Sequence, residues 1–270
     1  TAAEVIILLT GRQESAFNDS IVLDSFSLFF TLIFLLAAAL TILSSIHYIR
    51  QLHLREGEFY ALILFATVGM IVMASANDLL TLFVSLEFST LGFYILVGYL
   101  RDDLASNEAG LKFFILGVFA AGLLAYGISL VYGETGKLVF SEMTLTATPG
   151  AIIGFLLIFA ALGFKIGAVP FHSWIPDTYH GAPTPVTAFL SIAPKGAAFA
   201  ILLRIFFVVL ASFKPVWIIL LVAVSILSMT YANIVAIAQR NIKRLLAYSG
   251  IAQIGNILIG HGPSSSGSAR

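Results

Sequence analysis

The chain has 270 residues, of which 59% are hydrophobic and 10% are charged, and its formal net charge at pH 7 is zero. A soluble domain carries about 25% charged residues, so this chain lacks the polar surface that a water-facing globule needs, and lipid is its expected solvent. The balanced charge gives no indication of nucleic-acid binding, and the absence of cysteine excludes disulfides and thiolate-bound iron–sulfur or zinc centres within the chain.

Long apolar stretches recur along the whole chain. A membrane-spanning helix needs about 20 mostly apolar residues. Such stretches predict about eight full transmembrane helices, at roughly 22–46, 59–76, 78–100, 108–131, 150–171, 186–210, 215–238 and 242–260. The predicted fold class is therefore all-α, a polytopic bundle of membrane helices.

The two ends of the chain depart from this pattern. Residues 3–12 indicate the tail of a helix rather than a signal peptide, because no basic start and no small-residue cleavage site is present. Residues 261–270 are small and polar, and we expect them to be disordered. Because the first residue is Thr1 rather than methionine, we interpret the sequence as a fragment of a longer membrane protein.

Lysine and arginine in the predicted connections give an orientation. Three basic residues fall on one side of the membrane, namely Arg12, Lys137 and Lys214. Six fall on the other side, namely Arg50, Arg55, Arg101, Arg240, Lys243 and Arg244. The side with six is expected to face the cytoplasm or its organellar equivalent.

Among the charged side chains inside the predicted helices, four are the most informative: Glu87, Lys112, Lys165 and Lys195. A charge at the centre of a membrane helix costs about 2.5–3.5 kcal/mol on insertion scales. We therefore expect these groups to face protein, water or one another rather than lipid. We interpret the set as a charge-conducting path, with a purely structural role as the alternative.

A buried Glu–Lys pair can act as an electrostatic switch, because a third charge can open it. Glu87 and Lys112 lie on adjacent predicted helices joined by a short loop, so we expect them to pair. When the pair opens, Lys112 is free to act on Lys165, which then releases its proton. His172 is suited to bridge the lysines through water, since imidazole accepts and donates protons near neutral pH.

The stretch "GFKIGAVPFHSWIPDTYHGAPTPV", residues 163–186, combines these charges with four prolines. Pro170 lacks a backbone donor and clashes with the preceding turn, so it predicts one broken helix near 165–182. In lipid, a broken helix persists only where protein or a water-filled cavity satisfies the freed backbone. The alternative is an ordinary loop followed by a proline-rich helix start.

The same stretch contains a weak candidate for a metal site in His172, Asp177 and His180. Two histidines and one carboxylate in a loop are not specific, and we predict no metal. Asp177 is expected instead to cap the half-helix or to bond freed backbone groups.

Two motifs identify a family. "FKIGAVPFHSWIPDTYHGAPTPVTAFLSIAPKGAAFAILLR", at 164–204, and "NIKRLLAYSGIAQIGNILIG", at 241–260, resemble the antiporter-like membrane subunits of respiratory complex I (NADH:quinone oxidoreductase), and subunit N among them. The likeness extends from about residue 25 to 260, and its motifs are highly specific.

The resemblance implies two inverted repeats of five helices, each with one broken helix. On this basis residues 1–58 hold N-terminal helices and 59–210 form the first repeat. Residues 211–260 hold the first two helices of a truncated second repeat, and 261–270 form the tail.

The resemblance also implies a hydrated proton path through five residues. Glu87 matches the glutamate of "SLEF", and Lys112 matches a partner lysine on the next helix. Lys165 matches the lysine of the broken helix, His172 the histidine of "PFHSW", and Lys195 the lysine of "APK".

The function implied is that of a proton-translocating subunit driven by quinone reduction elsewhere in the complex. Expected partners are the other membrane subunits, lipid, protons and water, with no nucleic acid. No cofactor is expected in this chain, and the expected location is the bacterial plasma membrane or an organellar energy-converting membrane. An Mrp-type cation/proton antiporter subunit and a truncated, non-pumping scaffold remain the alternatives.

Overall fold

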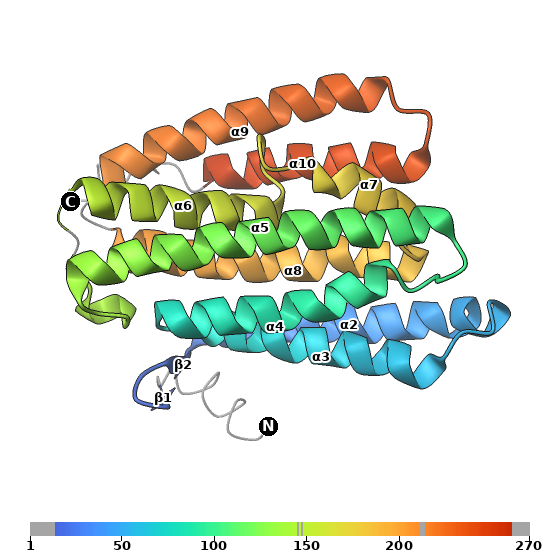
Figure 1. Cartoon of the computed structure of the whole chain (residues 1–270), viewed down its shortest axis with the longest axis horizontal. Helices are drawn as coiled ribbons and strands as arrows, with labels where there is room; N and C mark the ends of the chain where they lie inside the picture. The colour runs from blue at the N-terminus through green and yellow to red at the C-terminus, as the bar shows by residue number, and fades with distance from the viewer. Residues whose placement is uncertain (1–13, 145, 147, 211–213, 261–270) are drawn as a thin grey trace, which may run out of the picture.

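The computed structural model describes residues 14–144, 146, 148–210 and 214–260. The predictions for residues 1–13 and for the tail at 261–270 fall outside these ranges. Long helices run side by side along one axis and make up most of the fold, as Figure 1 shows. In chain order, the elements are β1 (Glu14–Ala16), β2 (Ile21–Leu23), α2 (Ser25–Gln51), α3 (Glu56–Ser75), α4 (Leu79–Val97), α5 (Leu104–Thr135), the 3-10 turn η1 (Phe140–Glu142), α6 (Pro149–Ile166), α7 (Trp174–Gly181), α8 (Thr184–Arg204), the π-helical turn η2 (Ile205–Val209), α9 (Lys214–Ile237) and α10 (Ile242–Gly260).

Each of the eight apolar stretches found in the sequence forms one long helix. Within the described ranges, seven of them are long and apolar enough to cross a membrane, namely α2, α3, α4, α5, α6, α8 with η2, and α9. The eighth is α10, whose first turn carries Lys243 and Arg244. The prediction of an all-α, polytopic membrane bundle is confirmed.

The helices begin at side-chain caps. Asp24, Asp78, Asp103 and Thr148 each accept a hydrogen bond from a backbone N–H in the first turn of the helix that follows. The first N–H groups of a helix have no partner within the helix, so these caps satisfy donors that would otherwise be orphaned. They set where α2, α4, α5 and α6 start.

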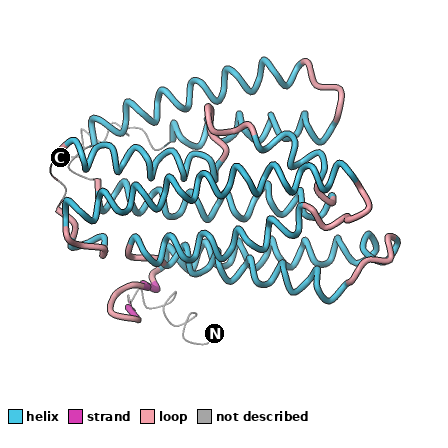
Figure 2. The backbone as a smooth tube through the Cα atoms, viewed as in Figure 1, coloured by secondary structure: helices cyan, strands magenta, loops and turns pink. Residues whose placement is uncertain are grey.

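The connections between helices gather at the two ends of the bundle (Figure 2). The α2–α3, α4–α5 and α9–α10 connections share one end, on the right in Figure 1, together with α7. We call it the basic end, because it carries Arg50, Arg55, Arg101, Arg240, Lys243 and Arg244. The hairpin of β1 and β2 lies at the opposite end.

One connection lies inside the bundle rather than at an end, between α6 and α7 (Figure 2). Helix α6 ends at Ile166, and Gly167 follows in the left-handed region with φ +80. Glycine adopts this conformation without the penalty that a Cβ imposes. The predicted broken helix near 165–182 is confirmed, and its break begins at Gly167, three residues before Pro170. We call residues 167–173 the elbow.

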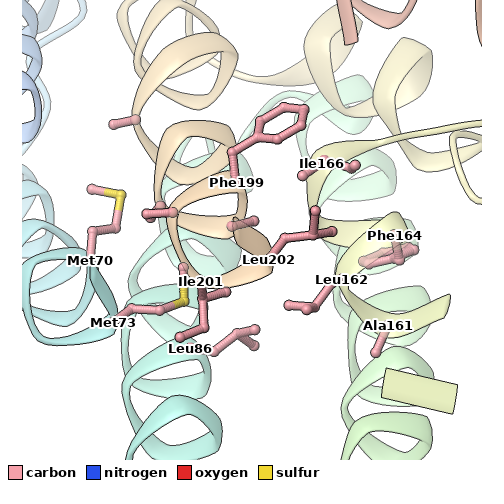
Figure 3. Close-up of a cluster of buried hydrophobic side chains, with 14 of the residues drawn as sticks. Met70, Met73, Leu86, Ala161, Leu162, Phe164, Ile166, Phe199, Ile201 and Leu202 are labelled. Carbon is pink, nitrogen blue, oxygen red and sulfur yellow. The ribbon is translucent and has the colours of Figure 1, made fainter. Parts of the chain in front are cut away.

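Helix α8 packs against α2, α3, α4 and α6 and so forms the centre of the core. Figure 3 shows Phe199, Ile201 and Leu202 of α8 between Met70 and Met73 of α3 on one side and the buried side chains of α6 on the other. Large apolar side chains elsewhere, such as Leu36, Phe119 and Ile234, are exposed on the outside of the bundle. That arrangement suits a helix bundle whose surroundings are lipid.

Two glycines let α5 and α6 approach closely, which supplies a test of the packing. A Cβ at Gly127 would lie 2.7 Å from the carbonyl oxygen of Gly154, whereas a Cβ at Gly122 on the same helix meets nothing within 4 Å. We expect Gly127→Ala to destabilise the protein by about 1–3 kcal/mol, as overpacking does. Gly122→Ala, the matched control, should be neutral or stabilising by up to about 1 kcal/mol. Melting temperatures of the purified protein in detergent measure both, and equal melting temperatures would contradict the close contact.

Candidate functional site

The centre of the candidate site is an ion pair between α4 and α6. Lys165 Nζ lies 3.8 Å from Glu87 Oε1, and the two side chains are only 11% and 22% exposed. Lys165 Nζ also donates a hydrogen bond of 2.8 Å to Thr90 Oγ1. Glu87 and Thr90 are one turn apart on α4, so both face Lys165. Thr90 was not among the predicted site residues, and its i, i+3 spacing from Glu87 is the feature of the sequence that could have indicated it.

A small cavity adjoins Lys165. Its volume is about 20 Å³, and Thr90, Phe113 and Trp174 are among the residues that line it. A cavity needs about 10–15 Å³ to hold one water molecule. Glu87 Oε1, next to this region, is buried and has no hydrogen-bond partner among the described residues. The cavity beside the pair therefore has room for about one water molecule, and Glu87 Oε1 is an acceptor without a hydrogen-bond donor among the described residues.

Lys112 does not pair with Glu87, so that prediction was wrong. Lys112 Nζ lies 2.6 Å from Glu108 Oε1 and 3.0 Å from Asp177 Oδ2, and its side chain is 46% exposed. The next two residues, Phe113 and Phe114, face α4, where both rings contact Tyr94. Successive residues of an α-helix point about 100° apart, so Lys112 is turned towards α7 instead.

Asp177 forms the centre of a charged cluster at the basic end. It pairs with Lys112 of α5 and, through its other oxygen, with Arg244 of α10. Asp177 therefore joins three helices, whereas the prediction was that it caps α7 or bonds freed backbone groups. The residue at the cap position is Ser173, which makes no side-chain capping bond.

An aromatic layer, formed by Phe113 and Trp174, borders the cavity beside the buried ion pair. The rings of Phe113 and Trp174 stack with their centroids 4.7 Å apart, and both residues line the cavity beside Lys165. Phe113 follows Lys112 directly, and Trp174 lies one turn before Asp177 on α7. The helices α5 and α7, which carry the Lys112–Asp177 pair, thus also carry the two rings that line the cavity beside Lys165.

The described residues give Lys195 no carboxylate partner. Its side chain is 93% buried on α8, at 7% relative exposure, and its Nζ lies 5.4 Å from the centre of the Tyr179 ring. Within the described ranges Lys195 has no hydrogen bond and no ion pair. It lines a cavity of about 690 Å³ between α8 and α10, which Lys243 and Gln253 also line. The position predicted from sequence, a deeply buried lysine on the helix after the break, agrees with this placement.

His172 lies in the elbow and faces α9. Its ring centroid is 4.7 Å from that of Tyr231, and its buried Nδ1 has no hydrogen-bond partner among the described residues. Its described contacts do not include Lys165 or Lys195, and the bridge through water between these lysines stays a prediction. Across the described ranges, no three His, Cys, Asp or Glu side chains lie close enough to hold a metal ion.

Comparison with known proteins places this geometry in a family. A family model described as NADH:quinone oxidoreductase/Mrp antiporter, transmembrane, matches residues 76–269. The chain belongs to this family. The match contains all five residues that the sequence analysis selected.

Individual members of the NADH:quinone oxidoreductase/Mrp antiporter family confirm the resemblance to subunit N. NADH-quinone oxidoreductase subunit N of Trichlorobacter lovleyi is 47% identical over 257 residues, which cover 93% of this chain and 53% of that protein. Its counterpart in Moorella thermoacetica is 46% identical over 244 residues, with coverages of 88% and 51%. The chain thus spans about half the length of the curated relatives it matches.

The fold agrees with that of a chain in a solved structure. A chain of respiratory complex I from Thermus thermophilus superimposes with a TM-score of 0.79 and 37% identity, over 96% of this chain and 56% of that one. The chain is a multi-pass integral membrane protein, and its bacterial relatives agree with the predicted plasma-membrane location.

Proposed function

We propose that this chain moves protons across the membrane as part of an antiporter-like subunit of an NADH:quinone oxidoreductase-type complex. The observation that carries the proposal is the buried Glu87–Lys165 pair, which lies beside a break in a membrane helix and a cavity of about 20 Å³. A charged pair at membrane depth is costly, and it is retained where charge or protons move.

The proposed path starts at the basic end. Lys112 and Asp177 lie next to the aromatic layer of Phe113 and Trp174, and Lys165 lies behind it. When the rings part, water connects the outer cluster with Lys165, which takes up or releases a proton at Nζ. The negative charge of Glu87 favours protonated Lys165, so any movement of Glu87 away from the pair favours release.

The onward step in this proposal is from Lys165 to Lys195. Lys195 lies on α8 beside a larger cavity and has no carboxylate to hold its charge. A charge arriving at one lysine raises the cost of a charge on the other, so the two groups are coupled electrostatically. His172, with a buried and unpartnered Nδ1, is the group in the elbow that is able to relay a proton.

The electron-transfer reaction that drives this movement belongs, in our proposal, to other subunits. The relatives are named as subunits of NADH-quinone oxidoreductase. From this similarity we propose that the partners of this chain are other membrane subunits of such a complex. The sequence has no cysteine for a thiolate-bound cluster, so the chain is proposed to act without a redox centre of its own.

A test of the proposal uses Lys195→Ala in the assembled parent complex. Because Lys195 has no ion-pair partner in the described structure, removing it leaves no unpaired carboxylate, and assembly should be retained. We expect proton uptake into inside-out membrane vesicles, divided by NADH oxidation, to fall severalfold. Lys137→Ala is the control, since Lys137 is an exposed lysine paired with Glu142 in a connection. Unchanged proton uptake per NADH in Lys195→Ala would remove Lys195 from the path.

A further inference from the structure

The elbow leaves backbone groups without helix partners, and one of them is satisfied from another helix. The N–H of Val169 donates a hydrogen bond of 3.0 Å to Ser228 Oγ on α9. The N–H groups of Gly167 and Ala168 are bonded within α6, to the carbonyl oxygen of Gly163. The Val169 bond is therefore the hydrogen bond through which α9 holds the backbone of the elbow.

The environment makes this bond important. Ser228 is fully buried, at 0% exposure, and Val169 is 8% exposed. A buried N–H without a partner costs free energy comparable to a lost hydrogen bond, and more where no water is available. Pro170, the next residue, has no N–H, so the bond from Val169 cannot be replaced by its neighbour.

A second contact between the same two segments fixes a side chain of the site. Tyr231, three residues after Ser228, packs its ring against that of His172. Residues three apart share one face of a helix. One face of α9 thus holds the elbow at its backbone, through Val169, and at its side chain, through His172.

We infer that Ser228 is a positioning residue for proton transfer, which holds the elbow and through it Lys165 and His172 in place. The inference rests on the proposed function. It connects two segments that nothing in the sequence gave reason to connect. These are the elbow, in the predicted first repeat, and α9, in the segment predicted to belong to the second repeat. A change in α9 is thereby transmitted to the break in the first repeat.

Hydrogen exchange tests the anchor independently of any activity. In the parent complex, Ser228→Ala should accelerate amide exchange in peptides covering 167–173 by about tenfold, the factor expected when one buried hydrogen bond is lost. Ser225→Ala is the matched control, because Ser225 is also fully buried on α9 but donates to Gly255 on α10. Ser228→Thr retains the hydroxyl and should retain slow exchange. If Ser228→Ala does not assemble, Ser228→Cys replaces it, since a thiol of similar size is a weak acceptor.

The functional half is tested by proton uptake per NADH oxidised in membrane vesicles. We expect a fall of at least twofold in Ser228→Ala, normal values in Ser225→Ala, and recovery in Ser228→Thr. Unchanged exchange at 167–173 would overturn the anchor. Faster exchange with unchanged proton uptake, while a Lys165 variant loses uptake, would overturn the positioning role and leave the proposed function intact. If the Lys165 variant also keeps normal uptake, the proposed function fails together with the positioning role, and the exchange data still decide the anchor.

Discussion

Replacing Lys165 with methionine is expected to lower the proton uptake of the parent complex per NADH oxidised by at least about tenfold. A loss of this size is typical of removing one proton-transfer group. Lys165 Nζ is the group that bonds Thr90, faces Glu87 and borders the small cavity, so no neighbouring side chain can take its place. Proton uptake into inside-out vesicles and NADH oxidation are measured on the same preparation.

A double variant separates this role from a structural one. Lys165→Met alone leaves Glu87 as a buried carboxylate without its partner, and breaking a buried ion pair in this way costs about 3–5 kcal/mol. Adding Glu87→Gln removes the orphaned charge and should restore assembly of the complex. In the proposed path the double variant assembles but still does not pump. Recovery of both assembly and pumping in the double variant would show that the pair is only structural.

The helix positions were accessible from the sequence because lipid demands long apolar stretches. Every stretch predicted to span the membrane became a helix, and the broken helix lies where Pro170 indicated it. The first residue of the break could not be read from the sequence: Gly167 ends α6 in a left-handed conformation, three residues before the proline. A glycine near a proline allows several end points, and tertiary packing selects one.

The pairing of charged side chains was harder to predict from the sequence than the positions of the helices. Sequence order put Glu87 and Lys112 on neighbouring helices, yet the rotation of α5 turns Lys112 towards Asp177 and leaves Lys165 to face Glu87. Rotation about a helix axis depends on the packing of all its neighbours. A nearly uniform apolar surface, as on α4 and α5, gives no periodic signal from which to read it.

The contacts made by α9 could not be predicted from the sequence for a different reason. Ser228 is one of several serines within apolar helices, and nothing in its local sequence distinguishes it from Ser225. Its role depends on meeting an unpaired N–H from a segment 59 positions away in the chain. Only the three-dimensional arrangement brings the donor and the acceptor together.

The second large effect is expected at the end of the bundle opposite the basic end, where Arg204 pairs with Asp24. Arg204 donates a hydrogen bond of 2.8 Å to Asp24 Oδ1 and another of 3.1 Å to the carbonyl oxygen of Ala74. The side chains of the pair are 12% and 14% exposed. Arg204→Met should destabilise the protein by about 3 kcal/mol, the lower end of the range for breaking a buried ion pair, because some solvent reaches both groups. Melting temperatures in detergent measure the loss.

The partner residue offers a sharper version of the same experiment. Asp24 also caps α2, since its Oδ1 accepts from the N–H of Ser27. Asparagine is as good a cap as aspartate, so Asp24→Asn keeps the start of α2 while it removes the charge. The double variant Arg204→Met with Asp24→Asn should therefore recover most of the stability that Arg204→Met loses. Arg55→Met serves as the control, because Arg55 and Glu58 form an exposed pair 2.7 Å apart, and losing a solvent-screened pair should leave the melting temperature almost unchanged. Equal losses for Arg204→Met and Arg55→Met would mean that burial adds nothing to the Arg204–Asp24 pair.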